Sequence, residues 1–224
     1  MSLRALSSFF FRKPSRVLAE INANAALLVW CKEHSTANVF RTYRDFYRHI
    51  NTEVLDSEPI DFLEFGVYKG TSLFSWAAIN NNEKSRFFGF DSFEGLPEDW
   101  FHARRTVRKG HFDTSGRVPE TSDSRIRFVK GLFQETLPSF LRTFTPHNRL
   151  VIHNDSDLYS STLYCLTQLD PILTPASVLI FDELFSATHE FRALLDYVQA
   201  YRRDYTVLAA MGANPYLRVA LTMQ

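Results

Sequence analysis

The spacing of apolar residues along the chain predicts alternating strands and helices. Short apolar runs bounded by polar or glycine positions predict five strands, at residues 60–65, 86–90, 126–129, 150–153 and 178–181. Apolar residues that recur every three or four positions predict helices at residues 71–79, 160–169 and 189–201. Strands separated by helices favour a mostly parallel sheet that is covered on both faces, which is a doubly wound α/β fold.

The two ends of the chain depart from this alternation. Two helical segments come first, one from Ser15 as its N-cap to about residue 29 and one over residues 39–50. We expect residues 1–55 to form a helical extension that packs on a core domain of residues 56–224. Apolar runs at residues 205–209 and 216–221 flank a loop that contains Gly212 and Pro215, so the sheet is expected to end in an antiparallel hairpin.

The amino-acid composition limits the kinds of partner and cellular location that we expect for this protein. Of 224 residues, 45% are hydrophobic and 22% are charged, which is ordinary for a globular protein. The 25 basic and 25 acidic residues balance, which disfavours binding to nucleic acid. No run reaches the roughly 20 apolar residues of a membrane span, and the apolar run at residues 6–11 is short for a signal peptide. We therefore expect a cytoplasmic protein in which Cys31 and Cys165 are buried thiols.

Acidic residues follow the ends of several predicted strands. They are Glu64, Asp91, Asp155, Asp182 and Glu183. Because the carboxyl ends of parallel strands meet at one edge, where open α/β sheets bind their ligands, we expect these side chains to converge. Their mutual repulsion favours a bound cation or a ligand rich in hydroxyl groups.

A glycine turn joins the first strand to its helix, in the segment Glu64-Phe-Gly66-Val-Tyr68-Lys-Gly70. Gly66 permits a tight turn, and Gly70 lets the backbone approach a ligand at the start of the helix. Asp91 ends the next strand, where a carboxylate can bind both hydroxyls of a ribose. Glycines that serve only the turn are the alternative, but together with Asp91 they favour a nucleoside-containing cofactor.

A second group of carboxylates comprises Asp155, Asp157, Asp182 and Glu183. Asp155, Asp182 and Glu183 follow strands that are expected to be neighbours, and they offer the all-oxygen ligands that suit Mg²⁺, with Mn²⁺ or Ca²⁺ as alternatives. Capping of the next helix by Asp155 or Asp157 is the other interpretation. His153, inside a strand, is typical of a packed core histidine.

The long segment from residue 92 to 123 has no strong periodicity, which is typical of a functional or disordered loop. Its basic residues, Arg104, Arg105, Arg108 and Lys109, are expected to be solvated, with contact to an acidic substrate as the alternative.

At these positions the chain resembles the macrocin O-methyltransferase family of class I S-adenosylmethionine-dependent methyltransferases. The matching blocks are DFLEFGVYKG (61–70), FGFDSFEGLP (88–97), GHFDT (110–114), VKGLFQETLP (129–138), HNDSDLYSST (153–162) and FDE (181–183). The resemblance implies a Rossmann-like sheet of seven strands with the seventh inserted antiparallel. It also implies an enzyme that uses S-adenosylmethionine and Mg²⁺ to methylate a hydroxyl of a sugar-containing or other small-molecule acceptor.

The resemblance implies roles for individual residues. The donor would be bound by Glu64, Gly66, Tyr68, Gly70, Thr71, Ser72, Asp91, Ser92, Gly131, Phe133 and Asp155. The metal would be held by Asp155, Asp182 and Glu183. Asp155 is the first candidate for the base that takes the hydroxyl proton, with Asp157 and His153 as alternatives.

Two departures from the family pattern leave alternatives open. Glu183 stands where many members have an aspartate, and residues 184–190 form a short segment beside the expected acceptor pocket. A metal-independent methyltransferase, a non-catalytic nucleoside-binding module and a nicotinamide-dependent oxidoreductase therefore remain as alternatives. The acceptor and the oligomeric state, with a homo-oligomer as one expectation, are not determined by these patterns.

Overall fold

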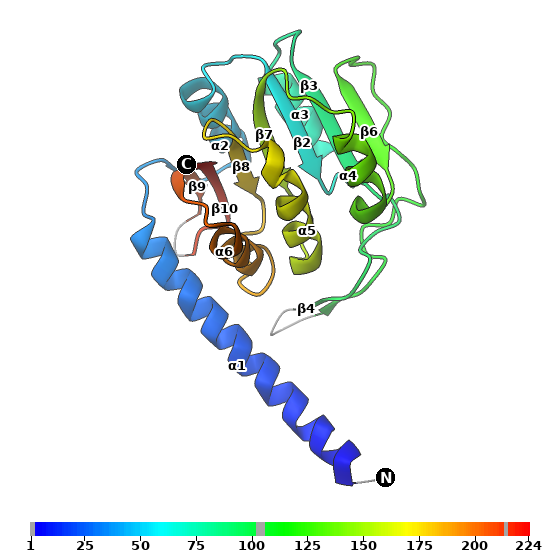
Figure 1. Ribbon diagram of the computed structural model, residues 1–224, viewed down its shortest axis with the longest axis vertical. Helices are drawn as coiled ribbons and strands as arrows, with labels where there is room; N and C mark the ends of the chain where they lie inside the picture. The colour runs from blue at the N-terminus through cyan, green and yellow to red at the C-terminus, as the bar shows by residue number, and fades with distance from the viewer. Residues whose placement is uncertain (1–2, 102–105, 213–214) are drawn as a thin grey trace.

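In the computed structural model, which describes residues 3–101, 106–212 and 215–224, a mixed eight-stranded sheet forms the centre of the molecule (Figure 1). The order across the sheet is β1-β9-β10-β8-β7-β2-β3-β6. Its strands are β1 (Val39–Phe40), β2 (Ile60–Phe65), β3 (Arg86–Asp91), β6 (Ile126–Lys130), β7 (Arg149–Asn154), β8 (Val178–Phe181), β9 (Tyr205–Met211) and β10 (Arg218–Met223). All five predicted parallel strands and the C-terminal antiparallel hairpin are confirmed, so the fold is the predicted doubly wound α/β fold.

The prediction of seven strands is wrong by one. Val39 and Phe40 form a short edge strand that pairs in parallel with Ala210 and Met211 of β9. The predicted helix over residues 39–50 therefore begins later, as α2 (Tyr43–His49). Two apolar residues carry no periodicity of their own, and only the unpaired edge of β9 makes them a strand.

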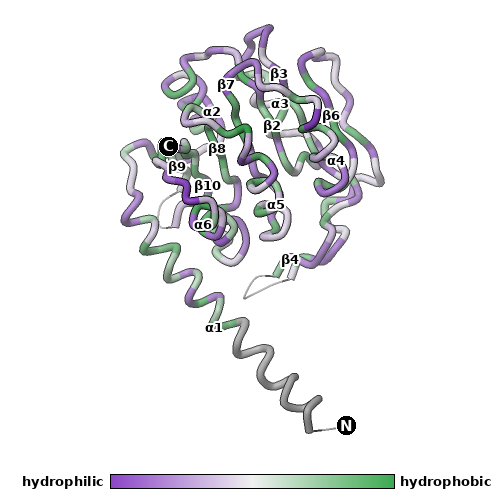
Figure 2. The backbone as a smooth tube through the Cα atoms, viewed as in Figure 1, coloured by the Kyte–Doolittle hydropathy of each residue, from purple (hydrophilic) through white to green (hydrophobic). Residues whose placement is uncertain are grey.

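Helices cover both faces of the sheet. They are α1 (Leu3–Glu33), α2, the π-helix η1 (Ile50–Val54), α3 (Thr71–Ile79), α4 (Phe133–Leu141), α5 (Tyr159–Leu169), the 3₁₀-helix η2 (Asp170–Ile172) and α6 (Glu190–Tyr201). One core contains side chains of α4, α5, α6 and the end of α1, and the other contains side chains of α2, η1 and α3. Hydrophobic residues follow the central strands (Figure 2). Alternate residues of each strand point to opposite faces, so the continuous apolar runs supply both cores.

The first helix is longer than predicted. It begins at Leu3 and continues through Pro14, so Ser15 lies inside the helix and is not its N-cap. A proline removes one hydrogen-bond donor from a helix, and here the helix continues on both sides of it. Trp30, near the end of α1, is buried and donates a hydrogen bond from its indole to the hydroxyl of Tyr205, at 2.6 Å.

Most of α1 extends away from the sheet (Figure 1). Apolar side chains on this part of the helix are exposed, including Leu18 at 60% and Ile21 at 58%. Both cysteines are buried, as predicted. Among the described residues, no helix is long and apolar enough to cross a membrane.

The chain order creates a switch point between β2 and β7. From β2 the chain runs to β3 and β6 on one side, and it then returns to β7 on the other side of β2. The two loops that leave the carboxyl ends of β2 and β7 therefore diverge and leave a crevice between them. The predicted glycine turn follows β2, and the predicted acidic segment follows β7.

Candidate active site

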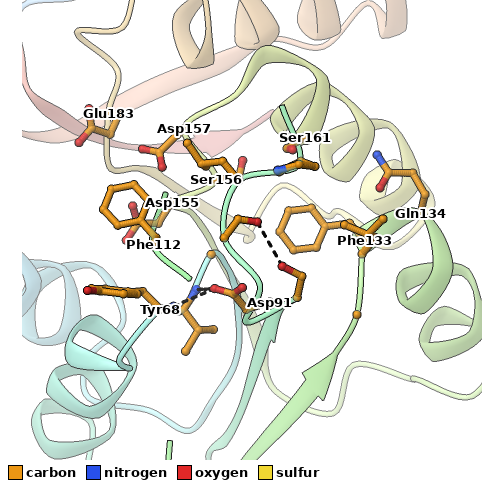
Figure 3. A pocket seen from close by; sticks show the side chains of 18 residues that line it. Tyr68, Asp91, Phe112, Phe133, Gln134, Asp155, Ser156, Asp157, Ser161 and Glu183 are labelled. Atoms are coloured by element: carbon orange, nitrogen blue, oxygen red, sulfur yellow. Dashed lines mark hydrogen bonds between the residues drawn. The ribbon is translucent and has the colours of Figure 1, made fainter. Parts of the chain in front are cut away.

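A pocket of about 280 Å³ lies at this crevice (Figure 3). Its lining comes from the loops that follow β2, β3, β6, β7 and β8. The lining residues are Gly66, Val67, Tyr68, Asp91, Ser92, Gly95, Leu96, Pro97, Phe112, Gly131, Leu132, Phe133, Gln134, Asp155, Ser156, Asp157, Ser161 and Glu183.

The pocket brings together many, but not all, of the predicted site residues. Those of the predicted donor site that line it are Gly66, Tyr68, Asp91, Ser92, Gly131, Phe133 and Asp155. Those that do not are Glu64, Gly70, Thr71 and Ser72. Asp157 and Glu183 line the pocket as well, whereas His153 and Asp182 are not part of its lining.

The backbone of the glycine turn lies directly against the loop that follows β7. Gly66 has a φ of +97°, and a Cβ atom at this position would lie 1.8 Å from the carbonyl oxygen of Asp155. The N–H of Gly66 donates to Phe90, and the N–H of Asp155 donates to Phe65. Only glycine allows this approach, so the turn after β2 and the acidic loop after β7 form one wall.

Asp91 organises the same turn. One of its carboxylate oxygens accepts hydrogen bonds from the N–H groups of Val67 and Tyr68, both at 2.8 Å, and the other accepts from the N–H of Phe93 at 2.7 Å. An ionised carboxylate is the natural acceptor for such converging N–H groups. Asp91 therefore holds the loop after β2 against the loop after β3, in addition to lining the pocket.

The long segment after β3 covers one side of the pocket. It carries a short hairpin of β4 (Trp100–Phe101) and β5 (Thr106–Val107), and it brings the ring of Phe112 to 5.4 Å from the ring of Tyr68. Of its basic residues, Arg108 is exposed and pairs with Asp99, while Arg104 and Arg105 lie outside the described residues.

A chain of buried charged groups lies beside the pocket. His153 is fully buried, and its Nδ1 lies 3.6 Å from Glu64, while its Nε2 lies 3.4 Å from Asp182. Asp182 is in turn held by the guanidinium of Arg218, whose Nη2 donates to Oδ2 at 2.7 Å and whose Nε donates to Oδ1. Glu64 also accepts a hydrogen bond from Ser72 at 2.5 Å.

These contacts set the charges of the buried groups. Burial would lower the pKa of His153, yet the adjacent carboxyl groups of Asp182 and Glu64 raise it to about 10. Burial would raise the pKa of Asp182, yet the adjacent His153 and the hydrogen bonds from Arg218 lower it to about 2. His153 thus lies between two acidic groups that favour its protonated form, while burial raises the pKa of Glu64.

The carboxyl groups of the pocket lining have raised pKa values, in contrast to Asp182. Burial, followed by repulsion from Glu183, Asp182 and Asp91, raises the pKa of Asp157 to about 8. Burial and repulsion from Asp182 raise the pKa of Asp155 well above its usual range. Asp157 is only 8% exposed, and among the described residues no donor reaches its carboxyl group.

The predicted magnesium ligands do not fit a divalent ion as a triad. Asp155 and Glu183 line the pocket, but both oxygens of Asp182 are engaged by Arg218. In the part of the chain that the structure describes, Glu64, His153 and Asp155 bring ligand atoms within 4.8 Å of one another. In that group Nδ1 of His153 already faces a carboxylate oxygen of Glu64 at 3.6 Å, so an ion between them would have to displace this contact.

Two charged groups of this region were missed by sequence reasoning. Arg218 opens β10, and the antiparallel register that pairs Val219 with Phe181 brings it opposite Asp182. Glu190, at the start of α6, is fully buried and accepts a hydrogen bond from the N–H of Glu183 at 2.9 Å. The predicted hairpin carried a signal for Arg218, because an antiparallel last strand begins at the edge where the parallel strands end.

Residues 63–184 match a protein family described as "Methyltransferase domain". The 4'-O-methyltransferase of Streptomyces olivaceus that acts on 8-demethyl-8-(2,3-dimethoxy-alpha-L-rhamnosyl)-tetracenomycin C is 31% identical over 180 residues, which cover 70% of this chain and 64% of that protein. The mycinamicin III 3''-O-methyltransferase of Micromonospora griseorubida is 27% identical over 64% of both chains. The matches thus span less than two thirds of these curated relatives' own length.

Solved structures show the same fold. The calicheamicin methyltransferase CalS11 superposes with a TM-score of 0.60 at 25% sequence identity, over 80% of this chain and 77% of that chain. The family match at residues 63–184 contains the whole stretch from the glycine turn to the loop after β8, and this part of the chain builds the pocket.

Proposed function

This chain belongs to the methyltransferase domain family, and on that premise we propose that it is an S-adenosylmethionine-dependent O-methyltransferase. The acceptor in this proposal is a hydroxyl of a small, sugar-containing molecule. The observation that supports the proposal is the pocket at the switch point, where the glycine turn at Gly66, the carboxylate of Asp91 and the acidic loop of residues 155–157 line one cavity. The names of the curated relatives, which include a methyltransferase for a rhamnosyl compound, support the choice of acceptor.

The donor is assigned to the side of the pocket built from the glycine turn and residues 131–134. Gly66 and Tyr68 would border the methionine part, and Asp91 would bind the ribose with the lone pairs that its three backbone contacts leave open. Phe133, on the other side of the pocket from Tyr68 (Figure 3), and Gly131, which also lines the pocket, would border the adenine.

When bound, S-adenosylmethionine supplies a methyl group on a positively charged sulfur. The acceptor oxygen forms the new bond to that methyl carbon, the carbon–sulfur bond breaks with its electron pair passing to sulfur, and the hydroxyl proton must be accepted by the protein. Holding the acceptor oxygen in line with the methyl group supplies much of the acceleration in such a displacement.

We assign the proton acceptor to Asp157. It lines the pocket, no protein donor among the described residues engages it, and its pKa of about 8 lies near the range in which a general base is most effective. Asp155 is the alternative in the same loop. His153 is disfavoured, because it is fully buried and because Glu64 and Asp182 raise its pKa to about 10, which favours the protonated form.

No step is assigned to a magnesium ion. The sequence predicted one at Asp155, Asp182 and Glu183, but Asp182 is bound by Arg218. The proposal therefore keeps the metal-independent form of the reaction, which the sequence had left open.

The first test is titration calorimetry with S-adenosylhomocysteine, the demethylated product of the donor. We expect micromolar binding by the wild type and no measurable binding by an Asp91→Ala variant. Transfer of an isotopically labelled methyl group to simple rhamnosides would then test the acceptor class. Absence of binding at ~1 mM ligand by the correctly folded wild type would leave a non-catalytic binding module and refute the proposal.

A further inference from the structure

The position beside Asp182 that a divalent ion would require is occupied by a side chain of the protein. Asp182 directly follows β8, and Arg218 is the first residue of β10. Because β10 runs antiparallel to β8, with Val219 opposite Phe181, its first residue comes to the carboxyl end of β8. The guanidinium then binds both oxygens of Asp182 as a two-pronged fork.

This ion pair is well shielded and supported by neighbours. The Asp182 side chain is 7% exposed and the Arg218 side chain is 25% exposed. Arg218 also contacts the sulfur of Met211 at 3.5 Å, and His153 approaches the same Asp182 oxygen that Nε of Arg218 binds. Bidentate pairs between a guanidinium and a carboxylate are among the strongest charge-assisted hydrogen bonds in proteins.

A divalent ion at this place would meet two obstacles. It binds carboxylate oxygens directly, at about 2.0–2.1 Å for Mg²⁺, so it would have to displace at least one prong of the guanidinium fork. A dication and a guanidinium on the same carboxylate would also repel each other at short range. Without Asp182, the two remaining ligands of the predicted triad are Asp155 and Glu183.

We infer that Arg218 is the resident cation of this site, and that the acidic end of the pocket holds no divalent metal ion while Arg218 is in place. Arg218 is a positioning residue in this inference. It neutralises and orients Asp182, and Asp182 together with Glu64 orients His153 beneath the pocket. The inference rests on the proposed function only in its corollary, which is that methyl transfer proceeds in EDTA.

The test measures metal binding directly, with Mn²⁺ as a probe whose free and bound forms differ in electron paramagnetic resonance. We expect wild-type protein to leave the spectrum of free Mn²⁺ unchanged up to ~1 mM metal. An Arg218→Gln variant removes the guanidinium from Asp182 and leaves a shorter, uncharged polar side chain. It should bind Mn²⁺ at least about tenfold more tightly than wild type, and an added Asp182→Asn change should abolish this gain.

The matched control is Arg203→Gln. Arg203 pairs with Asp170 at 2.8 Å, and neither residue lines the pocket. Its loss should leave Mn²⁺ binding as weak as in the wild type, which separates the position of Arg218 from the general loss of an ion pair.

Micromolar Mn²⁺ binding by the wild type would overturn the inference, whether or not the Arg218→Gln variant folds. Binding of S-adenosylhomocysteine, measured in the same samples, keeps this result separate from the proposed function. Wild-type protein that binds both S-adenosylhomocysteine and Mn²⁺ would retain the methyltransferase proposal and lose the role of Arg218. If the wild-type protein binds neither ligand, the methyltransferase proposal is refuted. The inference about Arg218 then stands, and only its corollary, methyl transfer in EDTA, is lost.

Discussion

Replacement of Asp157 by asparagine is expected to stabilise the fold and to slow methyl transfer at the same time. Asp157 has a φ of +62° and is 8% exposed. Asparagine tolerates this left-handed conformation about as well as aspartate does, and it has nearly the same shape. The substitution therefore changes little except the ability of the side chain to lose a proton.

The magnitude follows from the pKa of Asp157. Folding raises it from an ordinary 3.8 to about 8, so between these values the folded state holds a proton that the unfolded state has lost. Stability must then fall as the pH rises through this range, because the folded state binds more protons. At pH 7 the loss has an upper bound of about 4 kcal/mol, from about 1.36 kcal/mol per pKa unit. Because asparagine is itself a buried polar group, we expect Asp157→Asn to stabilise by about 1–3 kcal/mol at pH 7.

Urea denaturation at several pH values would measure this effect. The difference in the free energy of unfolding between variant and wild type should be small near pH 4 and should grow until about pH 8. Asp56→Asn is the matched control, since Asp56 is an exposed aspartate with a φ of +52°. Its substitution should change stability by less than about 0.5 kcal/mol at every pH.

The same variant tests the proposed base. Wild-type kcat/KM for the acceptor should rise about tenfold per pH unit below about 8 and level off above it, because only the ionised carboxylate accepts a proton. Asp157→Asn should lower kcat by about 10²–10⁴-fold and remove the inflection. An asparagine variant that is less stable than wild type at pH 7, or one that keeps the wild-type pH profile, would refute the reasoning.

Two further variants probe the loops at the pocket, and a third probes an ion pair at the opposite edge of the sheet. Gly66→Ala should abolish S-adenosylhomocysteine binding and lower the thermal midpoint of unfolding, because its Cβ would lie 1.8 Å from the carbonyl oxygen of Asp155. Titration calorimetry and a thermal melt measure these two effects. An alanine variant that binds normally would contradict the close approach of the two loops. Asp91→Asn places an amide donor among three N–H groups. It should lower the stability of the fold by about 1–3 kcal/mol and weaken S-adenosylhomocysteine binding more than tenfold in the same two assays. Unchanged affinity would argue that Asp91 serves neither the loop nor the ribose. Arg86→Leu leaves the fully buried Asp61 without its ion pair, so urea denaturation should show a loss of stability of about 3–5 kcal/mol. Affinity for S-adenosylhomocysteine, measured on the folded fraction, should stay unchanged. A loss below about 1 kcal/mol would show that the backbone N–H groups that bind Asp61 suffice.

Much of this fold could be predicted from the sequence because its signals are local. The strand at residues 60–65, the helix at residues 71–79 and the strand at residues 178–181 lie where the apolar pattern predicts them. The glycine turn and the acidic segment after β7 also converge as predicted, since parallel strands end at one edge. The family resemblance carried by the six sequence blocks is confirmed by the family match.

Other features were decided by partners that are distant in the sequence. β1 exists because N–H groups at the edge of β9 donate hydrogen bonds to the carbonyl groups of Asn38 and Phe40. Two apolar residues are too short a pattern to predict a strand. Arg218 reaches Asp182 only through the register between β10 and β8. The metal triad was predicted from carboxylates at the ends of neighbouring strands and from the family resemblance, and neither carries information about an arginine that the last strand brings to Asp182.

Asp157 and Asp182 show most clearly the difference between what the sequence determines and what the tertiary structure decides. The sequence determines that both are aspartates that follow strands at the same edge of the sheet. The tertiary structure decides that Asp182 receives an arginine and a histidine and has a pKa of about 2, whereas Asp157 is buried among other carboxylates and has a pKa of about 8. Local patterns specify elements because hydrogen bonding and burial repeat along the chain. The charge of a buried side chain depends on desolvation and on neighbours that only the folded chain brings within a few ångströms.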